Sequence, residues 1–402
     1  MEPLLFLAHR IPYPPNKGDK IRSYHLLQSL IQRYAVHLGA FVDDPADWPH
    51  EIALNSRCAS VNLLPLDTRR AKLLSLRGLL SGKPLTLPYY AHPAMQRWVD
   101  TTLQRHAIRR IVVFSSSMAQ YVTHHTGTFR LMDFVDLDSD KWRQYASTKP
   151  WPLRWLYRRE GTLLFDYECQ IARQFDASFL VSQHEAEPLR QALPEHASKI
   201  GWYHNGVDTQ YFDPSLDFPC PYPKNQIHLV FTGAMDYWPN VDAMNWFANS
   251  TFPSLRQRHP NLQLWIVGSN PGRSIQQLAT LPGIHVTGRV ADIRPYLAHA
   301  HVALAPLRIA RGIQNKVLEA LAMNLPVMLS PAALEGLSHD ILDSAGCLLA
   351  STPEDWNQLS GTWLTPNPSR FSLHRHWVRQ HFDWETNLSV LDSVMRPHSP
   401  SP

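Results

Sequence analysis

Short apolar runs alternate with longer segments of helical character along most of this chain. In the first half of the sequence the runs occupy residues 4–8, 37–42, 111–114 and 179–182. Short apolar runs separated by helical segments are typical of β-α units, whose strands associate into a parallel sheet. The pattern therefore predicts an α/β fold built on a buried parallel sheet.

The same rhythm begins again after a Pro-rich stretch at residues 214–223. At 402 residues the chain is also too long for one ordinary hydrophobic core. We therefore expect two Rossmann-like domains, each with its own parallel sheet, facing one another across a cleft. The apolar runs of the second sheet occupy residues 228–232, 263–267, 285–287, 301–305 and 326–330.

The domain boundaries follow from this rhythm. We expect the first domain at residues 1–205, a linker at 206–224 and the second domain at 225–375. A final helix at 376–395 has Leu388, Leu391 and Val394 on one face and is expected to return toward the first domain. The Pro- and Ser-rich tail at 396–402 is expected to be disordered.

The composition narrows the class of protein. Hydrophobic residues make up 44% of the chain and charged residues 18%, which is typical of a soluble globular protein. The formal net charge of +4 is too small and too dispersed for nucleic-acid binding, although it suits an anionic substrate or membrane surface. The four scattered cysteines favour a reducing compartment over a disulfide framework.

The sequence also shows neither a signal peptide nor a membrane-spanning segment. The N-terminal apolar run is too short for the core of a signal peptide. The sequence contains no uncharged apolar stretch of the roughly 18 residues that a membrane span requires. We therefore expect a cytoplasmic protein whose contact with a membrane is at most peripheral.

The most informative segment is residues 305–323, in which a strand ends, a glycine loop follows and a helix begins. A helix N-terminus presents free N–H groups and the positive end of the helix dipole, which together bind anions. Arg308, Arg311 and Lys316 crowd this end, where the dipole disfavours cations unless an anion lies between them. This predicts a bound phosphate; the alternative is a simple Lys316–Glu319 pair at i,i+3.

This segment resembles the retaining family 4 glycosyltransferases of GT-B fold, whose second domain carries a helix of the form Asn-Lys-x-Leu-Glu-Ala-x-Ala after such a loop. The resemblance extends to residues 204–208, 231–240, 266–268 and 286–290. It implies that Glu319 holds the ribose of a nucleotide diphosphate sugar and that the backbone near residues 286–290 reads the nucleobase. The expected donor-binding residues are Gly18, Gly233, Arg289, Val290, Arg308, Gly312, Ile313, Gln314, Asn315 and Glu319.

The sequence departs from the family pattern at two places. Many members have a glutamate at the position of Arg311, and many have an Arg and a Lys where this chain has Ala234 and Met235. We infer that Arg308, Arg311 and Lys316 supply the missing positive charge. Arg311 and Lys316 are accordingly expected to be catalytic, stabilising the charge that builds on the departing diphosphate.

In the first half, the loop at residues 11–25 follows the first strand and is expected to face the cleft. Gly18 is the only glycine in this loop, and Lys17, Lys20 and Arg22 would place charge where substrates bind at the ends of parallel strands. The alternative is a rigid, Pro-stapled surface turn.

An acidic run at residues 133–142 allows two interpretations. Asp136 and Asp138 have the spacing by which GT-A glycosyltransferases hold a metal. The run also resembles a block of the family 4 enzymes associated with exosortase-linked exopolysaccharide clusters, in which no metal is needed. We expect Asp136 to orient the acceptor hydroxyl, with Asp138 and Asp140 as loop or N-cap residues.

No metal site and no cofactor is expected elsewhere. The sequence offers three histidine pairs, at 124 and 125, at 299 and 301, and at 374 and 376. None comes with a carboxylate or cysteine at a known ligand spacing, so we interpret them as surface histidines.

Two further stretches combine basic residues with leucine or tryptophan. Residues 69–80 and 151–159 have a composition suited to anionic lipid headgroups, and a solvated helix face covering the core explains each equally well.

The resemblance implies a retaining transfer of a glycosyl group from a nucleotide sugar to a hydroxyl of a lipid-linked or polysaccharide acceptor, in exopolysaccharide or cell-surface glycan biosynthesis. In the family the leaving phosphate is thought to help deprotonate the acceptor. The alternatives are a nucleotide-sugar epimerase of the same fold, which needs no acceptor, and a non-catalytic scaffold in polysaccharide assembly.

Overall fold

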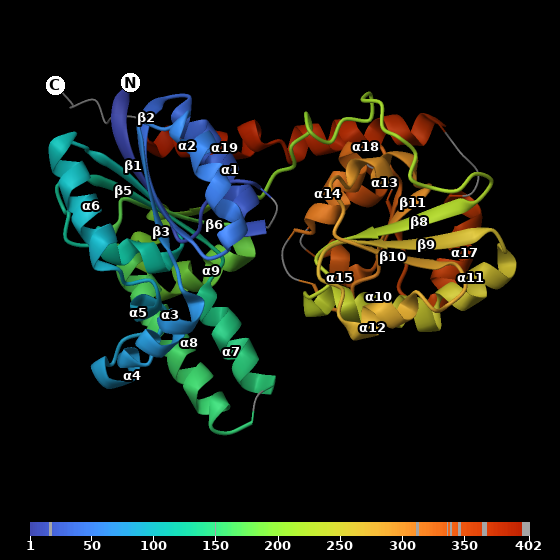
Figure 1. Ribbon diagram of the computed structural model, residues 1–402, viewed down its shortest axis with the longest axis horizontal. Helices are drawn as coiled ribbons and strands as arrows, with labels where there is room; N and C mark the ends of the chain where they lie inside the picture. Colours follow the sequence, from blue (N-terminus) through green and yellow to red (C-terminus); the bar gives the residue numbers. More distant parts are fainter. Residues whose placement is uncertain are drawn as a thin grey trace. The chain divides into compact units, whose positions relative to one another are not determined.

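The computed structural model describes residues 1–15, 18–148, 150–310, 313–335, 337, 340–344, 347–363 and 368–395. These residues form two compact units (Figure 1). Unit 1 comprises Met1–His204 together with residues 388–395, and unit 2 comprises Asn205–Asn387.

A parallel sheet forms the centre of unit 1. Its seven strands are β1 (Glu2–Ala8), β2 (Tyr34–Val42), β3 (Ser60–Pro65), β4 (Arg110–Phe114), β5 (Phe129–Val135), β6 (Ala177–Leu180) and β7 (Ile200–Trp202). Their order is β3-β2-β1-β4-β5-β6-β7. The predicted runs at 4–8, 37–42 and 111–114 lie within strands, the run at 179–182 extends two residues past β6, and the sequence does not predict β3, β5 or β7.

Helices connect these strands in the manner of β-α units. They are α1 (Gly18–Ile31), η1 (Pro45–His50), α2 (Glu51–Asn55), α3 (Thr68–Ser75), α4 (Arg77–Ser81), α5 (Thr86–Tyr89), α6 (Pro93–Arg105), η2 (Ser116–Tyr121), α7 (Asp138–Thr148), α8 (Leu153–Gln174), α9 (Gln183–Ala192) and η3 (Pro194–Lys199). In Figure 1, α7 and α8 lie side by side and extend beyond the sheet of unit 1.

Two buried glutamates anchor α8. The Glu160 carboxylate accepts hydrogen bonds from the backbone N–H groups of Leu85 and Thr86, at 2.7 and 3.0 Å. The Glu168 carboxyl is hydrogen-bonded to the backbone N–H and the hydroxyl of Ser139 at the start of α7. Burial raises the pKa of Glu168 to about 8, so this group is largely protonated at neutral pH.

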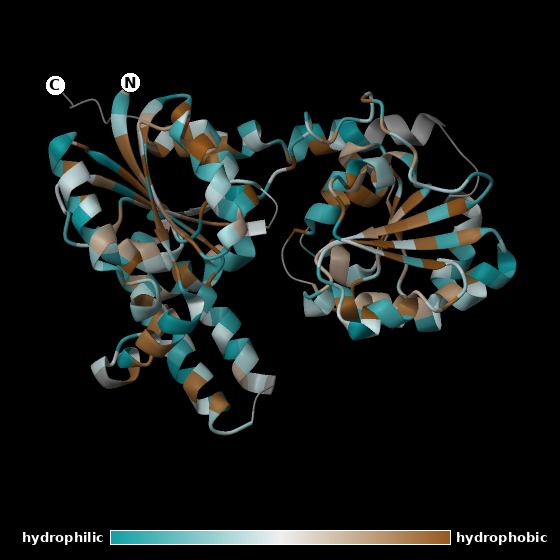
Figure 2. Cartoon of the chain, viewed as in Figure 1, coloured by the Kyte–Doolittle hydropathy of each residue, from teal (hydrophilic) through white to brown (hydrophobic). Residues whose placement is uncertain are grey.

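Unit 2 has a parallel sheet of its own. Its six strands are β8 (Ile227–Thr232), β9 (Leu262–Val267), β10 (Ile284–Gly288), β11 (Val302–Ala305), β12 (Val327–Leu329) and β13 (Leu348–Leu349). The strand order is β10-β9-β8-β11-β12-β13. Each of the five apolar runs predicted for this half overlaps one of the strands β8 to β12. In Figure 2 the strands of unit 2 are predominantly hydrophobic, as expected for a sheet covered on both faces.

The helices of unit 2 complete an α/β arrangement. They are α10 (Trp238–Ser250), α11 (Phe252–Arg258), α12 (Arg273–Leu278), α13 (Arg294–His299), α14 (Asn315–Ala322), α15 (Pro331–Leu334), α16 (Ile341–Ser344), α17 (Pro353–Trp363) and α18 (Pro368–His381). The predicted α/β class, with two Rossmann-like parallel sheets, is therefore confirmed.

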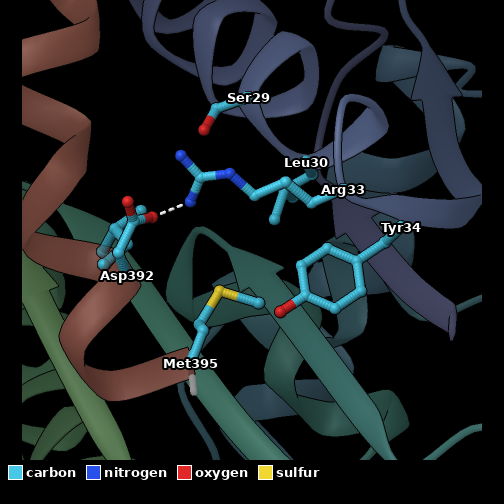
Figure 3. A pocket seen from close by; sticks show the side chains of 7 residues that line it. Ser29, Leu30, Arg33, Tyr34, Asp392 and Met395 are labelled. Atoms are coloured by element: carbon cyan, nitrogen blue, oxygen red, sulfur yellow. Dashed lines mark hydrogen bonds and ion pairs between the residues drawn. The ribbon is translucent and has the colours of Figure 1, made fainter. Parts of the chain in front are cut away.

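The last helix, α19 (Trp384–Met395), begins in unit 2 and ends in unit 1. In unit 1 its end borders a pocket of about 300 Å³ next to α1 and β2. Figure 3 shows the Arg33 guanidinium paired with Asp392 across this pocket, with Tyr34 and Met395 beside them. The predicted disordered tail at 396–402 lies outside the described residues.

The structure also bears on the predictions about disulfides and membrane spans. All four cysteines are free thiols. Among the described helices, none combines the length and the apolar character that crossing a membrane requires.

Both sheets reverse their strand order at one point. In unit 1 the reversal falls between β1 and β4, and in unit 2 it falls between β8 and β11. In open parallel sheets, ligands bind at the carboxyl ends of the strands beside such a reversal. A ligand site is therefore expected at the carboxyl ends of these two strand pairs.

Candidate functional site

At the carboxyl end of β8 the backbone passes very close to that of β9. Gly233 has a φ of 154°, and a Cβ added there would lie 2.7 Å from Asn240 Nδ2. A Cβ at Gly268 would lie only 1.7 Å from the Gly233 carbonyl oxygen. Only glycine fits at these two positions, so the sequence keeps side chains out of this edge.

Asn240 on α10 connects this turn to α14. Its Nδ2 donates to the Ala234 carbonyl at 2.9 Å, and its Oδ1 accepts from Lys316 Nζ at 2.5 Å. The Lys316 ammonium also lies 4.2 Å from the centre of the Phe231 ring. Lys316 is in the first turn of α14, as predicted, and its ammonium is held at the carboxyl end of β8.

Burial shifts the pKa values of two polar groups on α14. Desolvation lowers the pKa of Lys316 to about 7, against the opposing effect of Glu319. Desolvation raises the pKa of Glu319 to about 7, against the opposing effect of Lys316. Neither group is fully ionised at neutral pH, so an anion bound near Lys316 would favour its charged form. Perturbed pKa values of this kind cluster at functional sites.

Arg308 does not stand free beside Lys316 as the sequence argument assumed. Its Nε donates to Asp242 Oδ2 at 2.8 Å, and a second hydrogen bond joins the same two side chains. The Arg308 side chain remains 52% exposed. A carboxylate on α10 therefore accounts for the Arg308 charge without an anionic ligand, and donor binding by Arg308 stays a prediction. Arg311 and Gly312 lie outside the described residues.

The start of α14 carries an unsatisfied acceptor. Asn315 Oδ1 is buried and has no hydrogen-bond partner among the described residues. Buried polar atoms without a partner are rare in native proteins, so such an atom favours an interaction with a bound molecule. Next to it, Gln314 occupies the N-cap position and Ile313 packs on the core of unit 2.

The predicted base-reading segment, residues 286–290, comprises the end of β10 and the two residues after it. Gly288 has a φ of 68°, which turns the chain sharply at the end of the strand. Beyond it Arg289 is exposed, whereas Val290 packs against the core. Both therefore lie at the same carboxyl edge of the sheet as Gly233.

A polar cluster that the sequence does not predict lies next to this edge. The Arg294 guanidinium lies 3.9 Å from the centre of the Tyr211 ring and pairs with Asp292 at 2.7 Å. Burial raises the pKa of Tyr211, and Asp292 and Glu319 add to this shift. The cluster is thus in electrostatic contact with Glu319. No sequence pattern could have found it, because Tyr211 and Arg294 are far apart in the chain.

In unit 1, backbone strain marks the carboxyl ends of β4 and β5. Ser115 has a φ of 75° and Val135 a φ of 70°, a conformation that is rare for residues other than glycine and strained for a β-branched one. Asp136 follows directly, and its carboxylate lies 2.8 Å from Lys141 Nζ. The structure therefore places Asp136 at the edge where ligands of parallel sheets bind.

The loop predicted at residues 11–25 ends at α1, which begins at Gly18, and two basic residues of this segment have structural partners instead of facing a substrate. Lys20 is buried and its ammonium lies 2.5 Å from Asp47 Oδ2. Arg22 is completely buried, and its Nε lies 3.0 Å from Asp133 Oδ2. The prediction that Lys20 and Arg22 bring charge to the cleft is wrong, because both charges are neutralised in the core. Lys17 lies outside the described residues.

Gly18 is the first residue of α1. A Cβ added there would meet no atom of the described residues within 4 Å. In contrast to Gly233, this position does not require glycine.

The histidine pairs differ from the expected surface histidines in two respects. His374 is buried, with 1% of its surface exposed. His124 and His125 do lie beside a carboxylate, that of Asp100, which is 24 and 25 residues away in sequence and therefore has no recognisable spacing.

Comparison with known proteins identifies part of the chain. Residues 226–361 match the family described as Glycosyl transferases group 1. Unit 2 carries a glycosyl transferases group 1 domain. The matched segment includes Gly233, Lys316 and Glu319. No curated protein matches the sequence.

Solved structures resemble the whole chain. Sucrose-phosphate synthase from Thermosynechococcus elongatus is 16% identical with a TM-score of 0.66, and the match covers 98% of each chain. WaaG, a glycosyltransferase involved in lipopolysaccharide biosynthesis, is 16% identical with a TM-score of 0.63, covering 98% of this chain and 100% of WaaG. HepE from Anabaena, solved with UDP and glucose, is 14% identical with a TM-score of 0.64, covering 98% and 99%. The fold is therefore GT-B, as predicted.

Proposed function

We propose that this protein is a retaining glycosyltransferase of family 4, which transfers a sugar from a nucleoside diphosphate sugar to a hydroxyl of a lipid-linked or polysaccharide acceptor. The observation that carries the proposal is the Lys316 ammonium, held by Asn240 at the carboxyl end of β8 inside a glycosyl transferases group 1 domain. UDP-glucose is the first donor to test, because HepE from Anabaena was solved in complex with UDP-glucose.

Lys316 and Glu319 act on different parts of the donor in this proposal. Lys316 lies in the first turn of α14 beside Gly233, where the diphosphate is proposed to bind. Negative charge grows on the diphosphate as the sugar leaves, so the ammonium stabilises the transition state more than the ground state. Glu319 lies about one turn further along α14, where its carboxylate can accept from the ribose hydroxyls. Arg311 is proposed, from the sequence motif alone, to add positive charge for the diphosphate.

Asp136 is proposed to orient the acceptor hydroxyl. Its carboxylate lies 2.8 Å from Lys141 Nζ and its side chain is 34% exposed, so it can accept a hydrogen bond from a substrate. The strained backbone at Val135 directs it, and this strain is held in place by the Asp133 carboxylate, which accepts from the Val135 N–H at 3.0 Å. The leaving phosphate takes up the acceptor proton, so the reaction requires neither a metal ion nor a cofactor.

We propose further that unit 1 docks on the inner face of an anionic membrane through a surface formed by α3, α4 and the start of α8. Leu73 is 71% exposed, Trp151 82% and Trp155 57%. The Arg159 guanidinium donates to the Gly78 carbonyl at 2.8 Å, which joins α4 to α8. Figure 2 shows hydrophobic residues on the α3–α4 segment and at the start of α8. The basic residues beside them are Arg69, Arg70, Lys72, Arg77, Arg154 and Arg158.

This composition suits a lipid surface. Tryptophan and leucine insert at the boundary of headgroups and acyl chains, and each nearby Lys or Arg contributes about 1 kcal/mol toward anionic lipid. A cytoplasmic enzyme docked in this way meets lipid-linked acceptors of exopolysaccharide or cell-surface glycan synthesis, such as the exosortase-linked systems.

The proposal is tested with purified protein, a panel of nucleotide sugars and a lipid-linked acceptor. Thermal shift identifies the donor, and the expected product is a glycoside whose anomeric configuration, read by NMR, equals that of the donor. Transfer should continue after treatment with a chelator. Inversion, or loss of transfer that manganese restores, would contradict the retaining, metal-independent mechanism.

The two alternatives give different results in the same assay. An epimerase converts the donor without any acceptor, whereas the proposed transferase turns over only when the acceptor is present. A scaffold binds donor or partner without turnover.

A further inference from the structure

Three metal-binding side chains meet in unit 1, far from the carboxyl edge of its sheet. Asp100 lies on α6, and His124 and His125 lie in the segment between η2 and β5. Nε2 of His125 is 2.9 Å from Asp100 Oδ1, and Nε2 of His124 is 3.4 Å from the same oxygen. One ligand atom from each residue lies within 4.8 Å of the others.

These separations suit a zinc ion. Zinc bonds to histidine nitrogen and carboxylate oxygen are about 2.0–2.2 Å long, and in a tetrahedral site neighbouring ligand atoms are then roughly 3.3 Å apart. The two distances to Asp100 lie on either side of this value. The His124 side chain is 55% exposed, so it can adjust its position without disturbing the core.

The protein also fixes the ligands before any ion binds. Gln96 Nε2 donates to Asp100 Oδ1 at 3.0 Å and to the Tyr121 carbonyl at 3.1 Å. The Thr128 hydroxyl donates to the His125 carbonyl at 2.8 Å. Ligands oriented by outer hydrogen bonds are typical of metal sites, and their loss weakens metal binding.

We infer that Asp100, His124 and His125 form a zinc site, with water completing the coordination. Two imidazoles favour Zn²⁺ over Mg²⁺ or Ca²⁺, which prefer oxygen ligands. The segment that carries both histidines leads into the amino end of β5, opposite the edge where Asp136 lies. The ion therefore joins α6 to the entry of β5 and stabilises unit 1, without a part in sugar transfer.

The test uses the full chain, freed of metal with a chelator and titrated with Zn²⁺ by calorimetry. We expect one ion bound per chain at this site and a rise in the melting temperature. Co²⁺ in place of Zn²⁺ should give the intense visible absorption of four-coordinate cobalt. Gln96→Ala should lower the affinity roughly ten- to a hundredfold, and His124→Ala or His125→Ala should lower it further.

His184→Ala is the matched control, because His184 is an exposed histidine on α9. This variant should bind Zn²⁺ as the wild type does. His124→Ala is expected to stay folded, because the residue is exposed, and circular dichroism without metal verifies this. Equal Zn²⁺ binding by the wild type and His124→Ala, or no binding by either, would show that the three residues form only a hydrogen-bonded cluster.

Discussion

The amide oxygen of Asn240 lies 2.5 Å from the ammonium nitrogen of Lys316. This contact joins α10, which follows β8, to α14, which follows β11, at the point where the strand order of unit 2 reverses. The amide accepts a hydrogen bond but carries no charge, so it positions the ammonium without neutralising it. A carboxylate at the same place, like that of Asp242 beside Arg308, would compete with a bound phosphate. The difference between these two pairs makes Lys316 the better candidate for contact with the donor.

Lys316→Ala should lower kcat by roughly ten- to a thousandfold, with a smaller effect on nucleotide affinity, because the ammonium acts mainly on charge that appears in the transition state. Steady-state kinetics with the cognate donor measures this. Lys224→Ala is the control, because Lys224 is exposed and precedes β8, at the opposite end of the strand. A wild-type rate in Lys316→Ala would mean that the ammonium has only a structural role.

Glu319→Ala should mainly raise the KM for the donor. A carboxylate that accepts from ribose hydroxyls does so in the ground state and in the transition state alike, so its loss reduces uniform binding. Glu195→Ala, at an exposed glutamate of η3, serves as the control. Circular dichroism should show both variants folded. Unfolding of Glu319→Ala would instead indicate a role in the packing of α14.

The pH dependence of kcat/KM should be bell-shaped with its maximum near pH 7. The active form needs a charged Lys316 and an ionised Glu319, and burial brings the pKa of each to about 7. Below pH 7 Glu319 becomes protonated, and above pH 7 Lys316 loses its proton, so activity falls on both sides. Glu319→Gln should remove the fall on the acid side, and Lys316→Arg should remove the fall on the alkaline side. A flat profile between about pH 6 and 8 would contradict these assignments.

The apolar runs predict the strands of unit 2 well, because β8, β9, β11 and β12 each contain a buried apolar segment, whereas in β10 only Ile284 is buried. Apolar runs do not predict β5. It contains Arg130 and Asp133, which interrupt the apolar run, yet Asp133 is fully buried because Arg22, 111 residues earlier, neutralises it. A pair of this kind is formed by tertiary folding and leaves no local pattern in the sequence.

The candidate site shows the same limit. Lys316 and Glu319 are recognisable from the motif of α14 and lie where it predicts. The partner of Arg308 cannot be recognised from the sequence, because Asp242 is 66 residues away and only the packing of α10 brings it near. The strained backbone at Ser115 and Val135 is equally invisible in the sequence, since neither residue is one that favours a positive φ.

Glu168→Gln should stabilise unit 1 at neutral pH. The ordinary pKa of a glutamate is 4.5, and burial raises that of Glu168 to about 8. The contribution of Glu168 to the free energy of unfolding is therefore greatest below pH 4.5 and falls as the pH rises toward 8. The reason is that the unfolded chain releases a proton that the folded chain keeps. Glutamine imitates the protonated acid and avoids this loss, so the gain should be about 1–3 kcal/mol at pH 7. Urea denaturation at pH 4 and pH 7 measures the difference.

Glu160→Gln is the matched comparison on the same helix. The Glu160 carboxylate accepts from two backbone N–H groups and from the Thr86 hydroxyl. A glutamine would place an amide N–H against one of these donors, so this variant should lose about 1–3 kcal/mol. Equal effects of the two substitutions would contradict the different hydrogen-bonding roles of the two side chains.

Membrane docking should depend on Trp151 and Trp155. The wild type should sediment with vesicles that contain anionic lipid at low salt and should be released at high salt, because salt screens the basic residues of α3, α4 and α8. Trp151→Ser combined with Trp155→Ser should reduce sedimentation without altering the fold, since both side chains are more than half exposed. Ile52→Ser is the control, because Ile52 is 79% exposed on α2, outside the proposed surface. Binding that is indifferent to lipid charge, or an equal loss in Ile52→Ser, would mean that α3, α4 and α8 do not form the contact.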